Sequence, residues 1–130
     1  MTGKKVLIVD DEIHIVHVVA IKLRNNGYEV ISADNGAEAY ELACKEKPDI
    51  IVTDFQMPVM TGLELVEKLR QHQETKDIPV IMLTARNFAI PKEQQEELRI
   101  SDCLSKPFSP KELLGNIEDV LYQKQVMVSN

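Results

Sequence analysis

The chain has 130 residues, of which 44% are hydrophobic and 28% charged, and its formal net charge at pH 7 is −6. This length predicts one domain with its own core. The acidic balance argues against a nucleic-acid-binding surface, so we expect no direct nucleic-acid partner. We find neither an apolar run of membrane-spanning length nor a signal-peptide pattern, and expect no membrane partner. The two cysteines, Cys44 and Cys103, show no metal-binding spacing and fit a reducing, cytoplasmic location.

Short apolar runs alternate with amphipathic stretches along the chain. The apolar, partly β-branched runs predict strands at 6–9, 28–33, 50–52, 80–83 and 102–105. Each run is followed by helical spacing of apolar residues or by a helix-start signal. Strands that alternate with helices predict an α/β fold whose parallel strands are joined by right-handed crossovers.

Several local signals mark the helix boundaries. Capping boxes predict three helix starts, and their residue pairs are Asn35–Glu38, Thr61–Glu64 and Ser109–Glu112. The third helix is expected to turn Leu63, Val66 and Leu69 toward the core. Residues 91–98 start with a proline suited to the first helical position but are rich in Gln and Glu, which predicts a short, marginal helix. Residues 126–130 are expected to form a short C-terminal tail.

Polar side chains follow four of the five predicted strands, at the point where each strand ends. They are Asp10 and Asp11, Asp54, Thr84 with Ala85, and Lys106 with Pro107. The carboxyl ends of parallel strands lie at one edge of a sheet, where open α/β folds bind their ligands. A single such aspartate is equally compatible with a solvated loop. Four polar strand ends together favour a functional site.

The residue types at this edge limit its chemistry. Three carboxylates such as Asp10, Asp11 and Asp54 repel one another unless a cation lies among them, and Mg²⁺ prefers such oxygen ligands. A carboxylate can also act as a nucleophile and form an aspartyl phosphate, and Asp54, at the end of the central strand, is the candidate. Lys106 would neutralise a phosphoryl oxygen and Thr84 would hydrogen-bond another. Alternatively, Lys106 is only a structural ion-pair partner and Thr84 only a strand residue.

These motifs together resemble the receiver domain of two-component response regulators. The resemblance rests on Asp10-Asp11, on Asp54-x-x-Met57-Pro58 closing on Gly62, on Thr84-Ala85 and on Lys106-Pro107. It extends from about residue 4 to residue 125, which makes 1–130 a single receiver domain. It implies a flavodoxin-like, doubly wound five-stranded parallel sheet in the order 2-1-3-4-5, with five helices.

The resemblance also implies roles for the residues at the strand ends. Asp54 would accept a phosphoryl group from a phosphohistidine of a histidine kinase or a histidine phosphotransfer protein. Mg²⁺ would be bound directly by Asp11, Asp54 and the backbone carbonyl of Gln56, and through water by Asp10. Lys106, Thr84 and Ala85 would complete the site, and the Lys106–Pro107 peptide bond would be cis. Such a domain is not an enzyme in the usual sense, because it catalyses only its own phosphorylation and dephosphorylation and then signals to a downstream protein.

Two departures from the family pattern concern the signalling surface. Receivers usually have an aromatic switch residue three positions before the lysine, where this chain has Cys103, and Gly-Ala before the fifth strand, where it has Arg99-Ile100. Cysteine is too small to replace the moving ring that normally accompanies Thr84. We therefore expect phosphorylation to shift or order residues 86–98 instead.

Two other functions remain open. A phosphorylation-independent interaction module with the same fold would also tolerate Cys103. A Mg²⁺-dependent phosphatase with an aspartyl nucleophile usually has a second aspartate two residues later, but this chain has Gln56, which is a poor proton donor or acceptor.

Overall fold

The computed structural model describes residues 3–57, 59–85 and 88–129, with side chains described up to residue 124. Strands and helices alternate strictly along the chain. The strands are β1 (Lys5–Val9), β2 (Glu29–Ala33), β3 (Ile50–Asp54), β4 (Val80–Thr84) and β5 (Asp102–Ser105). The helices are α1 (Ile13–Asn25), α2 (Gly36–Glu46), α3 (Gly62–Arg70), α4 (Lys92–Glu97) and α5 (Pro110–Ser129).

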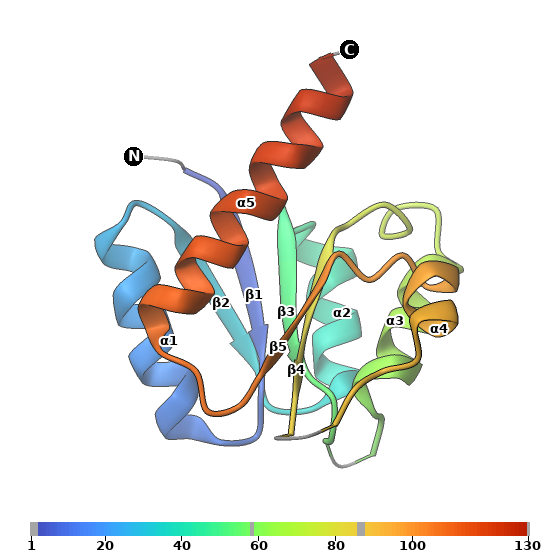
Figure 1. Cartoon of the computed structure of the whole chain (residues 1–130), viewed down its shortest axis with the longest axis horizontal. Helices are drawn as coiled ribbons and strands as arrows, with labels where there is room; N and C mark the ends of the chain where they lie inside the picture. Colours follow the sequence, from blue (N-terminus) through green and yellow to red (C-terminus); the bar gives the residue numbers. More distant parts are fainter. Residues whose placement is uncertain (1–2, 58, 86–87, 130) are drawn as a thin grey trace.

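The strands form one parallel sheet in the order β2-β1-β3-β4-β5. Helices α1 and α5 cover one face of the sheet, and α2, α3 and α4 cover the other (Figure 1). The doubly wound fold and its strand order are therefore as predicted. None of the helices in the described part of the chain is both long and apolar enough to span a membrane.

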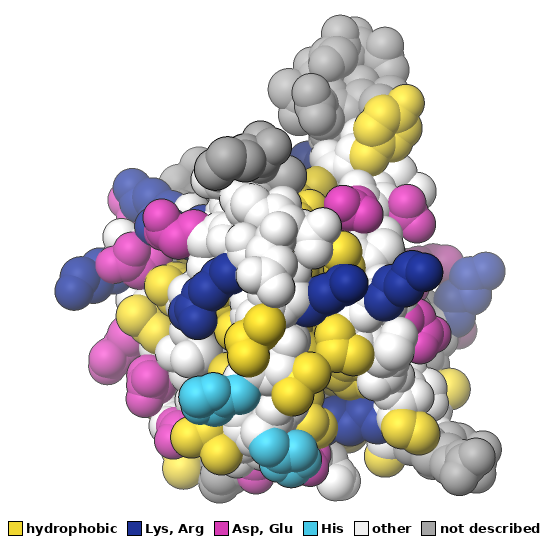
Figure 2. Space-filling model, turned by 90° about the vertical axis from the view of Figure 1, so that its left-hand side faces the viewer, with side chains coloured by type: hydrophobic (Ala, Val, Ile, Leu, Met, Phe, Trp, Pro, Cys, Tyr) yellow, Lys and Arg dark blue, Asp and Glu magenta, His cyan; other side chains and the backbone are white. Residues whose placement is uncertain are grey.

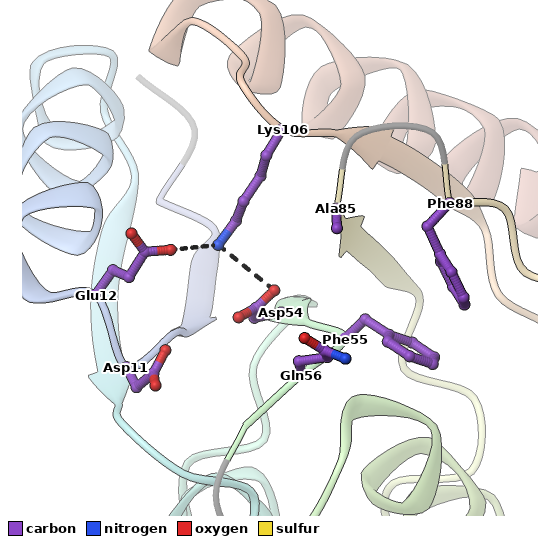
Figure 3. Close-up of a pocket in the computed structure, with 8 residues that line it drawn as sticks. All are labelled: Asp11, Glu12, Asp54, Phe55, Gln56, Ala85, Phe88 and Lys106. Atoms are coloured by element: carbon purple, nitrogen blue, oxygen red, sulfur yellow. Dashed lines mark hydrogen bonds and ion pairs between the residues drawn. The ribbon is translucent and has the colours of Figure 1, made fainter.

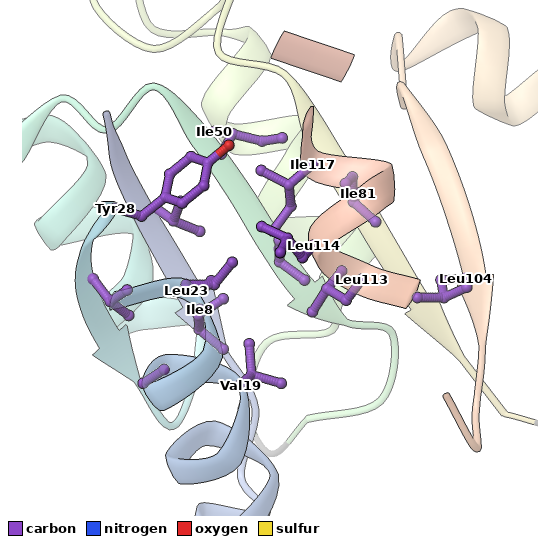
Figure 4. Packing of buried hydrophobic residues seen from close by; sticks show 14 of the residues in the cluster. Ile8, Val19, Leu23, Tyr28, Ile50, Ile81, Leu104, Leu113, Leu114 and Ile117 are labelled. Atoms are coloured by element: carbon purple, nitrogen blue, oxygen red, sulfur yellow. The ribbon is translucent and has the colours of Figure 1, made fainter. Parts of the chain in front are cut away.

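Each central strand contributes to two hydrophobic cores because successive side chains point to opposite faces of the sheet. In β1, Ile8 packs with the α1 and α5 side, whereas Leu7 packs with the α2 and α3 side. Figure 4 shows the first of these cores, in which Leu23 of α1 and Ile117 of α5 lie over the strands. A sheet buried on both faces explains why β1, β3 and β4 read as continuous apolar runs.

The predicted helix starts are present as side-chain caps. The Asn35 side chain accepts a hydrogen bond from the backbone N–H of Glu38 at 2.9 Å. Thr61 and Glu64 form a complete capping box at the start of α3. At the start of α5, the Ser109 hydroxyl accepts from the backbone N–H of Glu112 at 3.0 Å.

Some details differ from the sequence prediction. In α3, Leu65 is fully buried and Leu63 only partly, because the buried stripe runs through Leu65, Val66 and Leu69. The second strand begins at Glu29, one residue later than predicted, and α5 continues to Ser129 through most of the predicted tail. Helix α4 is short, as predicted, and none of its residues is buried.

Val59, in the loop between β3 and α3, has a strained backbone. Its φ is 71° and the residue is 89% exposed. A β-branched residue rarely adopts this left-handed conformation, and it gains no burial in return. We expect Val59→Gly to raise the free energy of unfolding by roughly 1 kcal/mol, measured by urea denaturation. Val18→Gly on the exposed face of α1 is the matched control and should lower it by about 1 kcal/mol. Equal losses in both variants would contradict strain at Val59.

Candidate functional site

The predicted polar residues gather at the carboxyl-terminal edge of the sheet. Asp10 directly follows β1, Asp54 ends β3, Thr84 ends β4 and Lys106 directly follows β5. Backbone hydrogen bonds continue past the strand ends: the Lys106 N–H donates to the Thr84 carbonyl at 2.8 Å. This bond keeps the backbone around Thr84 and Lys106 in line with the sheet.

Three carboxylates meet at this edge. Asp10, Asp11 and Asp54 each place an oxygen within 4.8 Å of the others. Asp10 and Asp54 are buried, whereas Asp11 is exposed. Burial raises the pKa of Asp54 to about 6; the charge of Asp10 acts in the same direction, and Lys106 opposes both. A cation next to Asp54 would therefore stabilise its ionised carboxylate.

Among the described residues, Lys106 supplies the positive charge next to these acids. Its Nζ lies 3.0 Å from Asp10 Oδ2, 2.9 Å from Glu12 Oε1 and 3.5 Å from Asp54 Oδ1. Burial alone would lower the pKa of Lys106, but the hydrogen bonds to Glu12 and Asp10 raise it above its ordinary value. The ammonium group therefore stays charged beside the acids. The following peptide bond to Pro107 is cis, as the resemblance implied.

Glu12 is a site residue that the sequence prediction missed. Its hydrogen bond from Lys106 holds the pKa of the Glu12 carboxyl below its ordinary value. The sequence did contain a signal, since Glu12 is the third acid in a row after the first strand. The prediction assigned roles to Asp10 and Asp11 only, because nothing local shows which way a third side chain turns.

A cavity of about 380 Å³ opens beside Asp54 (Figure 3). Its lining residues are Asp11, Glu12, Asp54, Phe55, Gln56, Ala85, Phe88 and Lys106. Ala85 is one of these lining residues. Thr84 is buried and is not among the described lining residues, so its hydroxyl does not form part of the cavity wall in this structure.

The loop after β3 is fixed by a close approach of Gly62. A Cβ atom on Gly62 would lie 2.5 Å from the carbonyl oxygen of Asp54, which is too close for any other residue. The Gly62 N–H also donates to the Phe55 carbonyl at 2.9 Å. The glycine at the end of the motif thus positions the loop that contains Gln56; Pro58 lies outside the described residues.

The donor set can accommodate a divalent cation. Both oxygens of Asp10 already accept hydrogen bonds, one from the Glu12 N–H at 2.9 Å and one from Lys106 at 3.0 Å. Asp11 and Asp54 have the freer oxygens and both line the cavity. Carboxylates arranged in this way, next to open space for water, suit Mg²⁺, which keeps several water ligands.

The family follows from comparison with known proteins. The model of the response regulator receiver domain matches residues 6–118. The chain belongs to the response regulator receiver family. As a receiver, it is 41% identical over 121 residues to the phosphate regulon transcriptional regulatory protein PhoB of Pseudomonas aeruginosa. That match covers 93% of this chain and 53% of PhoB, so the receiver spans about half the length of its relative.

Solved structures agree with this assignment. The chemotaxis response regulator CheY4 of Vibrio cholerae has a TM-score of 0.84 and 39% identity, over 92% of this receiver and 99% of CheY4. The receiver domain of sensor histidine kinase PA1611 from Pseudomonas aeruginosa has a TM-score of 0.81 and 28% identity, over 92% of this chain and 98% of that one. The PA1611 structure is described with a magnesium ion coordinated in its active-site cleft.

Cys103 lies away from the acidic site of this receiver. It is half-buried in β5 and packs against the core on the side of α2, α3 and α4. Burial raises the pKa of its thiol. Its partner in the sheet register is Met82 of β4. Cys103 is not among the described residues that line the cavity.

Proposed function

We propose that this receiver accepts a phosphoryl group on Asp54 and thereby switches its interactions with other proteins. The observation that carries the proposal is the environment of the Asp54 carboxylate. It is the buried end of a central strand, it lines an open cavity, and it lies 3.5 Å from the Lys106 ammonium. An attacking carboxylate needs access to the phosphorus atom and positive charge near the transferred group, and this site offers both.

The cavity residues would then have distinct roles. Lys106 would bind a phosphoryl oxygen with its ammonium group and keep its contact with Asp10. Ala85 would leave room for the donor, since its side chain is a single methyl group. The Thr84 hydroxyl would have to turn toward the cavity to bond the phosphoryl group, and this movement is the proposed start of the switch.

Asp11, Asp54 and the backbone carbonyl of Gln56 would hold Mg²⁺, with Asp10 acting through water. When bound, the ion would neutralise negative charge on the acids and on the transferred group. Support comes from the donor set and from the magnesium ion described for the PA1611 receiver domain. Mg²⁺ should therefore bind the folded state and not the unfolded chain.

Thermal unfolding tests this binding. Excess Mg²⁺ is expected to raise the melting temperature relative to EDTA, with a stabilisation of about 2.7 kcal/mol at one hundred times the Kd. Asp11→Asn should remove most of the increase because one direct ligand is weakened. Asp119→Asn, at an exposed position on α5, is the control and should keep it. A melting temperature that is the same in Mg²⁺ and in EDTA would contradict the metal site.

Phosphorylation itself is tested with acetyl phosphate and Mg²⁺, followed by intact-protein mass spectrometry. The wild type is expected to gain one phosphoryl group, whereas Asp54→Asn should gain none and EDTA should prevent the gain. A folded wild type that gains nothing would favour the phosphorylation-independent module. Continuous hydrolysis of an aryl phosphate would favour the phosphatase.

The proposed phosphodonor is a phosphohistidine-bearing protein, a histidine kinase or a histidine phosphotransfer protein. An apolar cavity of about 580 Å³ lies beside Lys106 and is lined by Ile15, Val18 and Phe108 among others. Figure 2 shows apolar side chains exposed on this side of the molecule, and Ile13, Val18 and Ile21 of α1 are more than half exposed. This surface suits the docking of a helix that brings its histidine to Asp54.

Signalling would proceed through the α4 side of the domain. Helix α4 buries none of its residues, and its C-terminal end is held by hydrogen bonds from Arg70 to the Leu98 carbonyl at 2.8 Å and the Arg99 carbonyl at 3.2 Å. Few buried contacts imply low local stability, which suits an element that shifts on phosphorylation. Of the segment 86–98 expected to respond, residues 86 and 87 lie outside the described part. Three points stay predictions: the domain binds a downstream protein, it makes no direct contact with nucleic acid, and it is located in the cytoplasm.

A further inference from the structure

Two phenyl rings form one side of the phosphoacceptor cavity. The centroids of Phe55 and Phe88 are 4.7 Å apart and their planes are tilted by 40°. Both rings line the same cavity as Asp54 and Lys106. In Figure 3 they lie on one side of Asp54, and Asp11 and Glu12 lie on the other. The cavity therefore has an aromatic wall and an acidic wall.

The backbone fixes both rings close to the reacting carboxylate. Phe55 directly follows Asp54, and its N–H donates to the Leu83 carbonyl at 2.8 Å. The Phe88 N–H donates to the carbonyl of Ala85 at 3.1 Å, which keeps Phe88 near the end of β4. The rings thus come from two different loops and meet over the cavity.

Phe88 lines the cavity on its solvent-exposed side, opposite the buried Asp54 carboxylate. Phosphoryl transfer places the attacking and leaving atoms roughly in line on opposite sides of phosphorus. The attacking Asp54 is only 8% exposed, so the leaving group points to the open side of the cavity. Phe88, at 41% exposed, and the exposed Ala85 lie on that side.

The chemistry of the two walls distinguishes leaving groups. When Asp54 attacks a protonated N-phosphorylimidazole, an O–P bond forms, the P–N bond breaks, and its electron pair stays on nitrogen. The ring keeps its other proton and departs as neutral imidazole. An aromatic face stabilises a planar ring of this kind, which carries a positive charge until the P–N bond breaks. Acetyl phosphate instead releases acetate, a small anion that gains no stabilisation from an aromatic face.

We propose that Phe88, packed against Phe55, is a specificity-determining residue that favours phosphodonors with an imidazole leaving group over acyl phosphates. This assignment rests on the proposed phosphorylation of Asp54. It goes further, because Phe88 is neither one of the acids nor the lysine, and yet it would influence which donor is used.

Rates of phosphorylation by monophosphoimidazole and by acetyl phosphate, both with Mg²⁺, test the assignment. Phe88→Ala and Phe88→Leu are each expected to lower the rate with monophosphoimidazole by roughly three- to tenfold. The rate with acetyl phosphate should change by less than about twofold, since acetate makes no aromatic contact. Phe88→Tyr keeps the ring and should keep the wild-type preference. The leucine variant separates loss of the ring from loss of apolar volume.

Tyr122→Ala removes an aromatic ring that is 68% exposed on α5 and serves as the matched control, with no expected effect on either rate. Circular dichroism and melting temperature establish that each variant is folded. Equal changes for both donors, or an unchanged ratio in Phe88→Ala, would overturn the role of Phe88 and leave phosphorylation of Asp54 intact. A wild type that accepts phosphate from neither donor would overturn the proposed function and this assignment with it.

Discussion

Replacing Asp54 by asparagine is expected to raise the free energy of unfolding of the metal-free protein by about 2–3 kcal/mol at neutral pH. Folding buries this carboxylate next to Asp10 and raises its pKa to about 6, above the value of 3.8 for the unperturbed group. Ionised Asp54 therefore favours the unfolded state and lowers the free energy of unfolding. Asparagine has nearly the same shape and removes this cost.

The stability gain of Asp54→Asn is expected to depend on pH. Below about pH 4, Asp54 is protonated in both states and the variant has no advantage. Between about pH 4 and pH 6 the unfolded chain loses this proton first, so the wild type loses stability relative to Asp54→Asn as pH rises. Above about pH 6 the advantage of Asp54→Asn is complete.

Urea denaturation in EDTA across this range measures the difference between variant and wild type. Asp119→Asn, at the exposed position on α5, is the control and should show no such pH-dependent gain. A gain in the free energy of unfolding of Asp54→Asn that does not vary with pH, or no gain at all, would contradict the raised pKa of Asp54 in the folded state.

Replacing Lys106 by methionine is expected to lower the free energy of unfolding in EDTA by about 3 kcal/mol. The side chain of Asp10 is completely buried, and Lys106 is the cation that pairs with it at 3.0 Å. Removing one partner of a buried ion pair leaves an uncompensated charge, and the remaining partner cannot move to water. Methionine retains most of the side-chain volume, so packing changes little.

The same denaturation experiment includes Lys111→Met on the exposed surface of α5 as the matched control, with an expected change within about 0.5 kcal/mol. The double variant Asp54→Asn/Lys106→Met should be more stable than additivity predicts, because Asp54 repels Asp10 most strongly once the ammonium is gone. A loss no larger than that of Lys111→Met would show that Lys106 is not the essential counter-charge of the acids.

Much of the site could be predicted because it depends on sheet topology. Once the strands are parallel, their carboxyl ends must lie together, so Asp10, Asp54 and Lys106 meet at one edge. Glu12 could not be placed in the same way. Its contact with Lys106 joins residues 94 positions apart and depends on how the chain turns into α1.

Other features depended on tertiary packing that no local pattern shows. The contact between Phe55 and Phe88 brings together two loops whose sequences give no sign of each other. In α3, a stripe through Leu63 and a stripe through Leu65 both have helical spacing, and only the position of the helix over the sheet selects Leu65. Helix caps were predicted well because they are local, as the pair Thr61 and Glu64 shows.

The central claim, that Asp54 is the phosphoacceptor, is tested most directly by locating the modified residue. The receiver is phosphorylated with monophosphoimidazole and Mg²⁺ and treated with borohydride, which reduces an aspartyl phosphate to homoserine. Tandem mass spectrometry of the peptides then identifies the reduced position. The predicted result is homoserine at Asp54, with Asp10 and Asp11 unmodified. Homoserine at Asp10 or Asp11, or a phosphoryl group retained on any residue other than Asp54, would contradict it.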